Sequence, residues 1–201
     1  MLKSRKIAIT GGLSAGKTTV CRIFKELGAY VVDADEIVHQ LLSSETVLTR
    51  QVLNLFGPEI LTSGTIDRKK IATIVFSRPD LLNALEKIVH PVVFDEIERR
   101  YKQVVQEKNA SLFVAEIPLL YEAEKEQQFD AVISVVAETD KCKGRFKGSA
   151  EEFDKRMSRQ LPPKQKAHRA GYTIKNNGTL EELRKQIQEL YLELTKNTGK
   201  E

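Results

Sequence analysis

The chain has 201 residues, a formal net charge of +4, 41% hydrophobic residues and 30% charged residues. These values favour an ordered chain over a disordered one and suit one domain with insertions. No apolar run approaches the ~18 residues of a membrane span. No secretory signal precedes the first expected strand, so we expect a cytoplasmic protein with no membrane partner. Cys21 and Cys142, the two cysteines, lack the spacing of a disulfide framework or a zinc site.

The positive charge is densest in one late part of the chain, at residues 141–147 and 156–169. A basic patch of this kind attracts small polyanions such as ATP as well as nucleic acids. No recognised nucleic-acid-binding motif accompanies it. We therefore expect small-molecule partners and no nucleic acid.

The first predicted elements are a buried strand at residues 6–10 and a helix at residues 18–27 that ends at Gly28. Between them the chain reads G-x-x-x-x-G-K-T, a phosphate-binding loop in the strand–loop–helix context that this motif requires. Its backbone N–H groups and the helix N-terminus would surround the phosphates of a nucleoside triphosphate. The predicted nucleotide-binding residues are Gly12, Leu13, Ser14, Ala15, Gly16, Lys17 and Thr18.

Two side chains of this loop carry specific chemistry. Lys17 would reach the outer phosphates, where we predict a catalytic role. The Thr18 hydroxyl would ligate a Mg²⁺ ion that bridges those phosphates. The alternative is a glycine-rich turn that matches the motif by chance, and the flanking strand and helix argue against it.

The second predicted strand, Tyr30–Asp33, ends in Asp33-Ala34-Asp35, at the sheet edge where the phosphate loop also emerges. Phosphoryl transfer to an alcohol requires a group that accepts the hydroxyl proton, and an aspartate near the γ-phosphate can do so. We therefore predict that Asp33 is catalytic. The alternative is that Asp33 and Asp35 only cap the helix that follows the strand.

A long helical stretch is expected between residues 36 and 109, where apolar residues recur at helical spacing. Its roughly seventy residues exceed what a crossover between parallel strands needs. We expect an insertion that holds the second substrate, because such insertions follow the carboxyl ends of the strands. Pro79 and Pro91 are both expected at helix starts.

The third predicted strand, Leu112–Glu116, is apolar and ends in an acid. A carboxylate at this position can hold a metal ion through water, so Glu116 is the second candidate magnesium residue. The alternative is that Glu116 only caps a helix or pairs with a basic side chain.

Two more strands are expected at Ala131–Val136 and Tyr172–Ile174. Together the strands predict an α/β fold with a parallel five-stranded sheet flanked by helices. The charged stretch at residues 140–169 predicts a helical lid over the phosphates, with a capping box that begins at Ser149. A second capping box at Thr179 predicts a final amphipathic helix that packs on the core.

Several short motifs resemble the dephospho-coenzyme A kinase family over nearly the whole chain. The phosphate loop is shared by many families, whereas the other motifs together are specific to this one. They are Val32-Asp33-Ala34-Asp35, Gly64-Thr65-Ile66-Asp67-Arg68, Ile88-Val89-His90-Pro91, Ile117-Pro118-Leu119-Leu120-Tyr121-Glu122 and Ile174-Lys175-Asn176-Asn177-Gly178.

The resemblance implies a P-loop nucleotide kinase fold, ATP and Mg²⁺ as cofactors, and phosphorylation of the ribose 3′-hydroxyl of dephospho-coenzyme A. It also implies a division of the chain. The nucleotide-binding core would comprise residues 1–35, 110–139 and 170–201. Residues 36–109 would bind the acceptor substrate, and residues 140–169 would form the lid.

The same resemblance implies roles for individual residues. Asp33 would be the base, and Asp35, Arg68 and His90 would lie in the acceptor part. By the residues alone, a solvated charge at a helix start would be the favoured interpretation of Arg68. His90 could equally be a structural histidine at a helix boundary. Arg145 would be the catalytic arginine of the lid.

Near the C-terminus the family pattern places Asn176 close to the adenine. The chain departs from that pattern at two points. The second lid arginine is missing or replaced by Lys147, and Gly171 stands where the family has an acid.

Two other functions fit part of the sequence. Another P-loop small-molecule or nucleoside monophosphate kinase would share the loop, the sheet and the lid, and would differ in the acceptor pocket. A regulatory GTPase would need an N-K-x-D element to specify guanine, and the chain has none. We therefore favour the kinase.

Overall fold

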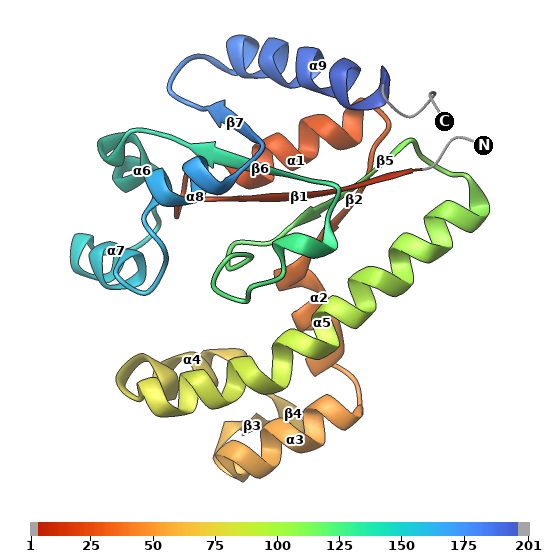
Figure 1. Cartoon of the computed structure of the whole chain (residues 1–201). Coiled ribbons are helices and arrows are strands. Elements are labelled where there is room, and N and C mark those ends of the chain that lie inside the picture. Colours follow the sequence, from red (N-terminus) through yellow and green to blue (C-terminus); the bar gives the residue numbers. More distant parts are fainter. Residues whose placement is uncertain (1–3, 197–201) are drawn as a thin grey trace. The chain divides into compact units, whose positions relative to one another are not determined.

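A computed structural model describes residues 4–196 of the chain (Figure 1). The chain divides into two compact units. The first unit contains the residues up to Asp33 and those from Tyr101 onward, and the second unit is Ala34–Arg100. None of the helices within residues 4–196 combines the length and the apolar character needed to cross a membrane.

The first unit is built on a parallel five-stranded sheet with the order β2-β5-β1-β6-β7. Short, nearly continuous apolar runs buried on both faces are typical of parallel strands. The predicted sheet is confirmed, and two of its five strands extend one residue beyond the predicted ends. The strands are β1 (Arg5–Gly11), β2 (Tyr30–Asp33), β5 (Leu112–Glu116), β6 (Ala131–Val136) and β7 (Tyr172–Lys175).

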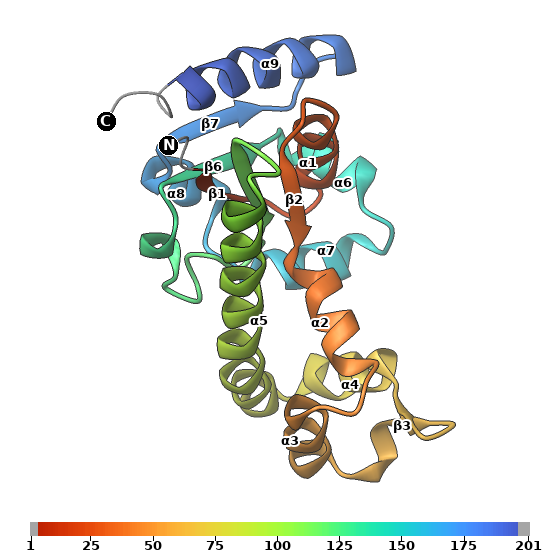
Figure 2. The ribbon, with the colours of Figure 1, turned by 90° about the vertical axis from the view of Figure 1, so that its right-hand side faces the viewer.

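Helices cover both faces of this sheet (Figures 1 and 2). On one face lie α1 (Lys17–Glu26) and α9 (Leu180–Lys196), and on the other α8 (Pro163–Arg169) packs against β6 and β1. The predicted capping box of α9 is complete, because the Thr179 N–H donates to Glu182 Oε2 at 2.8 Å and the Glu182 N–H to Thr179 Oγ1 at 3.2 Å. Its apolar face is buried, as expected for a helix that packs on the core.

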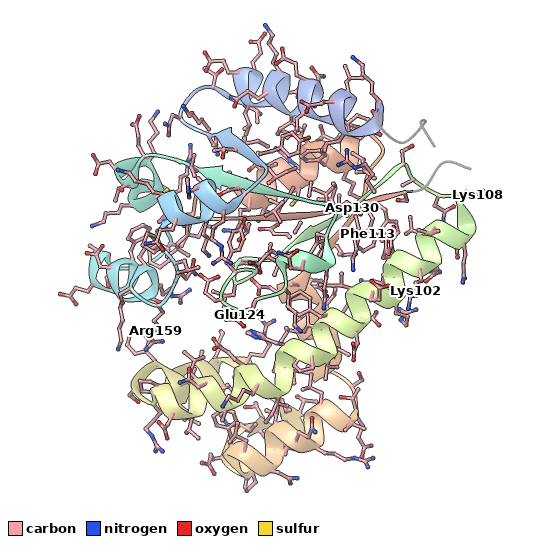
Figure 3. The ribbon with its side chains drawn as sticks, viewed as in Figure 1. Lys102, Lys108, Phe113, Glu124, Asp130 and Arg159 are labelled. Atoms are coloured by element: carbon pink, nitrogen blue, oxygen red, sulfur yellow. The ribbon has the colours of Figure 1, made fainter. Side chains whose placement is uncertain are left out.

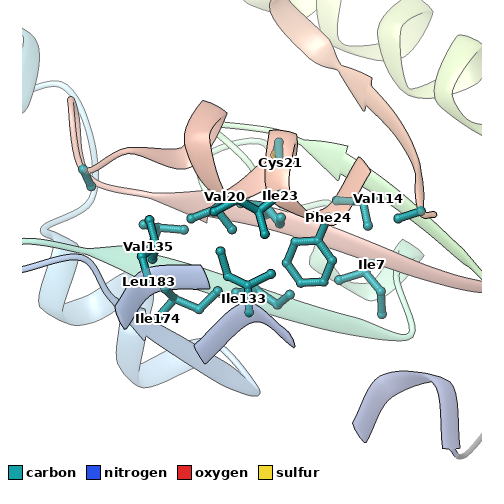
Figure 4. Close-up of a cluster of buried hydrophobic side chains, with 14 of the residues drawn as sticks. Ile7, Val20, Cys21, Ile23, Phe24, Val114, Ile133, Val135, Ile174 and Leu183 are labelled. Carbon is teal, nitrogen blue, oxygen red and sulfur yellow. The ribbon is translucent and has the colours of Figure 1, made fainter. Parts of the chain in front are cut away.

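The main hydrophobic core lies between α1, α9 and the sheet (Figure 4). Full burial of each of its large apolar side chains contributes roughly 1.5–3 kcal/mol. The core thereby fixes the strands from whose ends the candidate site is built. Its members include Ile7, Val20, Ile23, Phe24, Val114, Ile133, Val135, Ile174 and Leu183.

The segment predicted as a lid is helical, with α6 (Thr139–Arg145) and α7 (Ala150–Met157) ahead of α8. Ser149 caps α7, because its hydroxyl accepts the Glu152 N–H at 3.1 Å. Pro163 is the first residue of α8, where a missing N–H costs no helical hydrogen bond. A short turn, η2 (Glu126–Gln128), precedes β6.

The second unit is mostly helical, as predicted. Its helices are α2 (Ala34–Leu42), α3 (Val47–Phe56), α4 (Arg68–Ser77) and the first part of α5 (Pro79–Glu107). A turn, η1 (Pro58–Ile60), and a hairpin were not expected, because strands of two residues leave no alternating pattern to detect. The hairpin pairs β3 (Leu61–Thr62) with β4 (Thr65–Ile66).

The two proline predictions have different outcomes. Pro79 begins α5 as predicted, but Pro91 lies inside the same helix, so its prediction is wrong. An internal proline removes one helical hydrogen bond. The helix continues through it because α5 buries apolar side chains on both sides of Pro91, among them Val89, Val93 and Phe94.

Candidate active site

Two glycines shape the phosphate loop between β1 and α1. Gly16 has a φ of +98°, and a Cβ there would lie 2.2 Å from Asn176 Nδ2. A Cβ at Gly11 would lie 2.1 Å from the backbone oxygen of Val135. Only glycine fits at both positions, and the backbone can therefore wrap closely around an anion.

Lys17 begins α1 and folds back across the loop. Its Nζ donates to the Gly12 carbonyl oxygen at 2.9 Å, and its side chain is buried. The helix presents its positive end at this point. A cleft of about 360 Å³ lies here, lined by Ser14, Gly16, Lys17, Thr18, Thr19, Glu116 and Arg145. Of these residues, Thr19 was not singled out by the sequence, although it directly follows the motif.

Asp33 and Glu116 end neighbouring strands. The register of β2 and β5 pairs them, so their carboxyl groups project from the same face of the sheet. Thr18 Oγ1 donates to Glu116 Oε1 at 3.1 Å. Burial and the charge of Asp33 raise the pKa of Glu116, while Lys17 and Thr18 act in the opposite direction. The structure thus brings three predicted residues, Asp33, Thr18 and Glu116, to one point.

This set of oxygen atoms fits a Mg²⁺ ion. Magnesium in nucleotide sites is usually held by one or two carboxylates together with phosphates and water. The raised pKa of Glu116 reflects two carboxylates in one buried place, and a cation there would reverse that effect. Thr18 and Glu116 would hold the ion. Residues 4–196 contain no cluster of three or more His, Cys, Asp or Glu side chains that could hold a metal without phosphate ligands.

Arg145 and Asn176 meet at the same loop. Arg145 extends from α6, and its two terminal nitrogens donate to the carbonyl oxygens of Ala15 at 3.5 Å and Asn176 at 3.2 Å. The side-chain amide of Asn176 donates to the Ala15 oxygen at 2.8 Å and is buried. The structure therefore places Asn176 in support of the loop, with its Nδ2 atom committed to Ala15.

In the second unit, Arg68 is the first residue of α4 and is exposed. Asp67 caps this helix, because its carboxylate accepts the N–H groups of Lys69 and Lys70 at 2.9 and 3.4 Å. A hydrogen bond from the Thr62 hydroxyl, together with these two backbone contacts, lowers the pKa of Asp67. The capped start of α4 therefore fixes the backbone from which the Arg68 side chain extends at the surface of this unit.

A cleft of about 480 Å³ within the second unit is lined by Arg68 together with His39, Lys69, Leu42 and Ile66, among others. The sequence did not single out His39 or Lys69. His39 shares a helix face with Leu42 and Ser43, and this i, i+3, i+4 spacing is the signal that could have indicated it.

The other two predicted acceptor residues do not line this cleft. His90 lies within α5 and is partly buried, and Asp35 lies in the first turn of α2 and is exposed. Of the predicted acceptor residues in the second unit, the structure therefore brings only Arg68 into the cleft.

A parallel sheet with a phosphate loop after β1 and acidic residues at the ends of two adjacent strands defines a P-loop phosphotransferase of the small-molecule kinase type. The comparisons with known proteins identify the family. The model of the dephospho-CoA kinase family matches residues 5–182. The chain belongs to the dephospho-CoA kinase family.

Relatives with that name align over nearly the whole chain. A dephospho-CoA kinase of Protochlamydia amoebophila is 52% identical over 199 residues, which cover 96% of this chain and 98% of the relative. One from Chlamydia pneumoniae is 46% identical with the same coverage. Among solved structures, the dephospho-CoA kinase of Campylobacter jejuni has a TM-score of 0.71 at 25% identity and covers 96% of this chain and 98% of its own.

A shikimate kinase of Acinetobacter baumannii has a TM-score of 0.51 at 17% identity, over 99% of this chain and 97% of its own. This likeness shows the fold alone. The P-loop kinase fold and membership in the predicted family are therefore confirmed, and a different small-molecule kinase is not favoured.

Proposed function

We propose that this protein transfers the γ-phosphoryl group of ATP to the ribose 3′-hydroxyl of dephospho-coenzyme A, which yields coenzyme A and ADP. Membership in the dephospho-CoA kinase family supports this reaction. The observation that carries it is the pairing of Asp33 with Glu116 next to Lys17 and Thr18. Both substrates are small molecules, and we expect the proposed reaction to occur in the cytoplasm.

The phosphate loop binds ATP in this proposal. The backbone of residues 12–18 and the start of α1 surround the phosphates, and Lys17 contributes a point charge at the outer ones. Thr18 and Glu116 would hold Mg²⁺, which would offset negative charge on the phosphates of ATP. Asn176 acts in ATP binding by holding the loop at Ala15.

Asp33 accepts the proton of the 3′-hydroxyl while the hydroxyl oxygen forms a bond to the γ-phosphorus. The bond between that phosphorus and the bridging oxygen breaks, and ADP leaves with the electron pair. Arg145 faces the same cleft and stabilises the charge of the phosphoryl group in transfer. Residues 140–169 act as the lid that excludes water when the substrates are bound.

The acceptor would bind to the second unit. Dephospho-coenzyme A carries a diphosphate, which suits the planar fork of Arg68. The cleft that Arg68 lines also contains His39 and Lys69, two further cationic or titratable groups, beside apolar side chains. His90 and Asp35 complete the proposed acceptor residues. In this division, residues 36–109 bind the acceptor, and the rest of the chain outside the lid binds ATP.

The proposal is tested by measuring ADP formation with ATP and Mg²⁺ while dephospho-coenzyme A, adenosine, AMP and shikimate are offered separately. We expect turnover with dephospho-coenzyme A. Adenosine has the same 3′-hydroxyl and should be a far poorer acceptor, because it lacks the remote groups whose binding aligns that hydroxyl. A preference for AMP or shikimate would refute the proposal.

A further inference from the structure

Lys166 is a completely buried lysine to which the proposed mechanism assigns no role. It lies in α8, and its exposed fraction is 0%. Its Nζ forms an ion pair with Glu122 Oε1 at 2.8 Å and donates to the Pro118 carbonyl oxygen at 2.7 Å. A buried ammonium group is costly unless it is paired and hydrogen-bonded, and an apolar side chain would fill the same space at less cost. Packing alone therefore does not explain why a charged lysine is buried at position 166.

The Pro118 carbonyl oxygen joins three segments of the first unit. It accepts Lys166 Nζ from α8 and also the Thr10 hydroxyl at 3.1 Å. Thr10 directly precedes the glycines of the phosphate loop and is completely buried. Pro118 lies two residues after Glu116, and the Ile117 N–H between them donates to β1 at 2.8 Å. A shift of Pro118 would therefore move both Glu116 and the entrance of the phosphate loop.

Glu122 links the loop after β5 to α8 and to the residues just before it. Besides Lys166 it accepts the Leu161 N–H at 2.8 Å, just ahead of α8. The first residue of α8, Pro163, lies against the phosphate loop, since its Cγ would be 3.1 Å from a Cβ at Gly12. The loop after β5 that carries Glu122 continues through Glu124, which Figure 3 labels. Glu122 and Lys166 thus hold α8 against the loop that would bind ATP.

We propose that Lys166, paired with Glu122, is a positioning residue for the phosphate loop and for Glu116, and that it acts through the Pro118 carbonyl oxygen. This inference rests on the proposed kinase activity. A displacement of reacting groups by about 1 Å can reduce a rate roughly 10²-fold. Loss of the Lys166 hydrogen bond should therefore affect the ATP side of the reaction and spare binding of the acceptor.

The test compares three variants with the wild type in the dephospho-coenzyme A assay. Lys166→Met alone leaves Glu122 buried without its partner, so the main variant is Lys166→Met with Glu122→Met, which removes both charges and still lacks the donor to Pro118. Thr10→Val is nearly isosteric and removes the other hydrogen bond to the same oxygen. Lys185→Met is the matched control, because Lys185 is an exposed lysine of α9 and lies outside the lid.

We expect the double variant to unfold near the wild-type temperature, with kcat lowered about tenfold, KM for ATP raised and KM for dephospho-coenzyme A unchanged. Thr10→Val should show the same pattern at two- to fivefold, and Lys185→Met should match the wild type. An unchanged Thr10→Val enzyme, or a stable double variant with wild-type ATP kinetics, would overturn the inference. Equal changes for both substrates would also overturn it. Absence of turnover in the wild type would instead refute the proposed function.

Discussion

Gly16→Ala should damage both the stability and the activity of the protein, because the loop backbone at this position is available to glycine alone. The φ of +98° is in the left-handed region, where a Cβ costs roughly 1–2 kcal/mol. That Cβ would also lie 2.2 Å from Asn176 Nδ2, far inside contact distance. Asn176 must then move, and its hydrogen bond to the Ala15 oxygen is lost.

The size of the effect follows from these two terms. A buried amide left without its partner costs roughly 1–3 kcal/mol. Together with the cost of the backbone conformation, this lowers the free energy of unfolding by about 2–5 kcal/mol. Arg145 is also bonded to Ala15 and to the Asn176 backbone, so its guanidinium should lose its place at the cleft. We therefore expect KM for ATP to rise and kcat to fall by at least tenfold.

The measurements are urea unfolding and the ADP-release assay. Gly144→Ala is the matched control, because Gly144 lies in helix α6 and a Cβ there would meet nothing within 4 Å. That change should stabilise the protein by roughly 0.5–1 kcal/mol and leave activity intact. If Gly16→Ala unfolds within about 0.5 kcal/mol of the wild type and keeps its ATP kinetics, this account of the loop is wrong.

Three further substitutions test the chemistry of the cleft. Lys17→Ala should abolish phosphoryl transfer in a folded protein, and near wild-type turnover would exclude the loop as the catalytic site. Asp33→Asn should lower kcat by roughly 10² or more with little change in either KM, whereas a loss of binding alone would make Asp33 a positioning or capping residue. At pH values above the raised pKa of Glu116, its ionised carboxylate destabilises the folded, unliganded protein. Glu116→Gln should therefore increase the free energy of unfolding at those pH values. At acid pH, where Glu116 is protonated, this gain should vanish. The same variant should require more Mg²⁺ for turnover, and a lower stability than wild type at pH 8 would contradict the argument.

Local sequence patterns predicted most of the fold of the first unit. Each strand was a short apolar run, and the capping residues Ser149 and Thr179 indicated where two helices begin. The errors arose where packing overrides local preference. Pro91 reads as a helix start, but buried side chains on both sides carry α5 through it. The hairpin at Leu61–Ile66 was too short to leave a pattern.

The candidate site could be predicted only in part. The motif identified Lys17 and Thr18, but no local pattern specifies that β5 lies between β1 and β2. That strand order is what pairs Asp33 with Glu116 and brings Glu116 to Thr18. The long-range hydrogen bond from Lys166 to Pro118 could not be predicted either, because the partners lie 48 residues apart and Lys166 is in none of the motifs found in the sequence.

Several polar side chains are buried close to the phosphate loop. The apolar cluster on the α1 and α9 face packs against the strands of the sheet. Four polar side chains are also buried, and each belongs to the phosphate loop or lies within one or two contacts of it: Lys17, Glu116, Lys166 and Asn176. Burial of such groups is unfavourable in itself. Their concentration around one loop is expected if the fold gives up stability there to keep a phosphate site ready for its ligand.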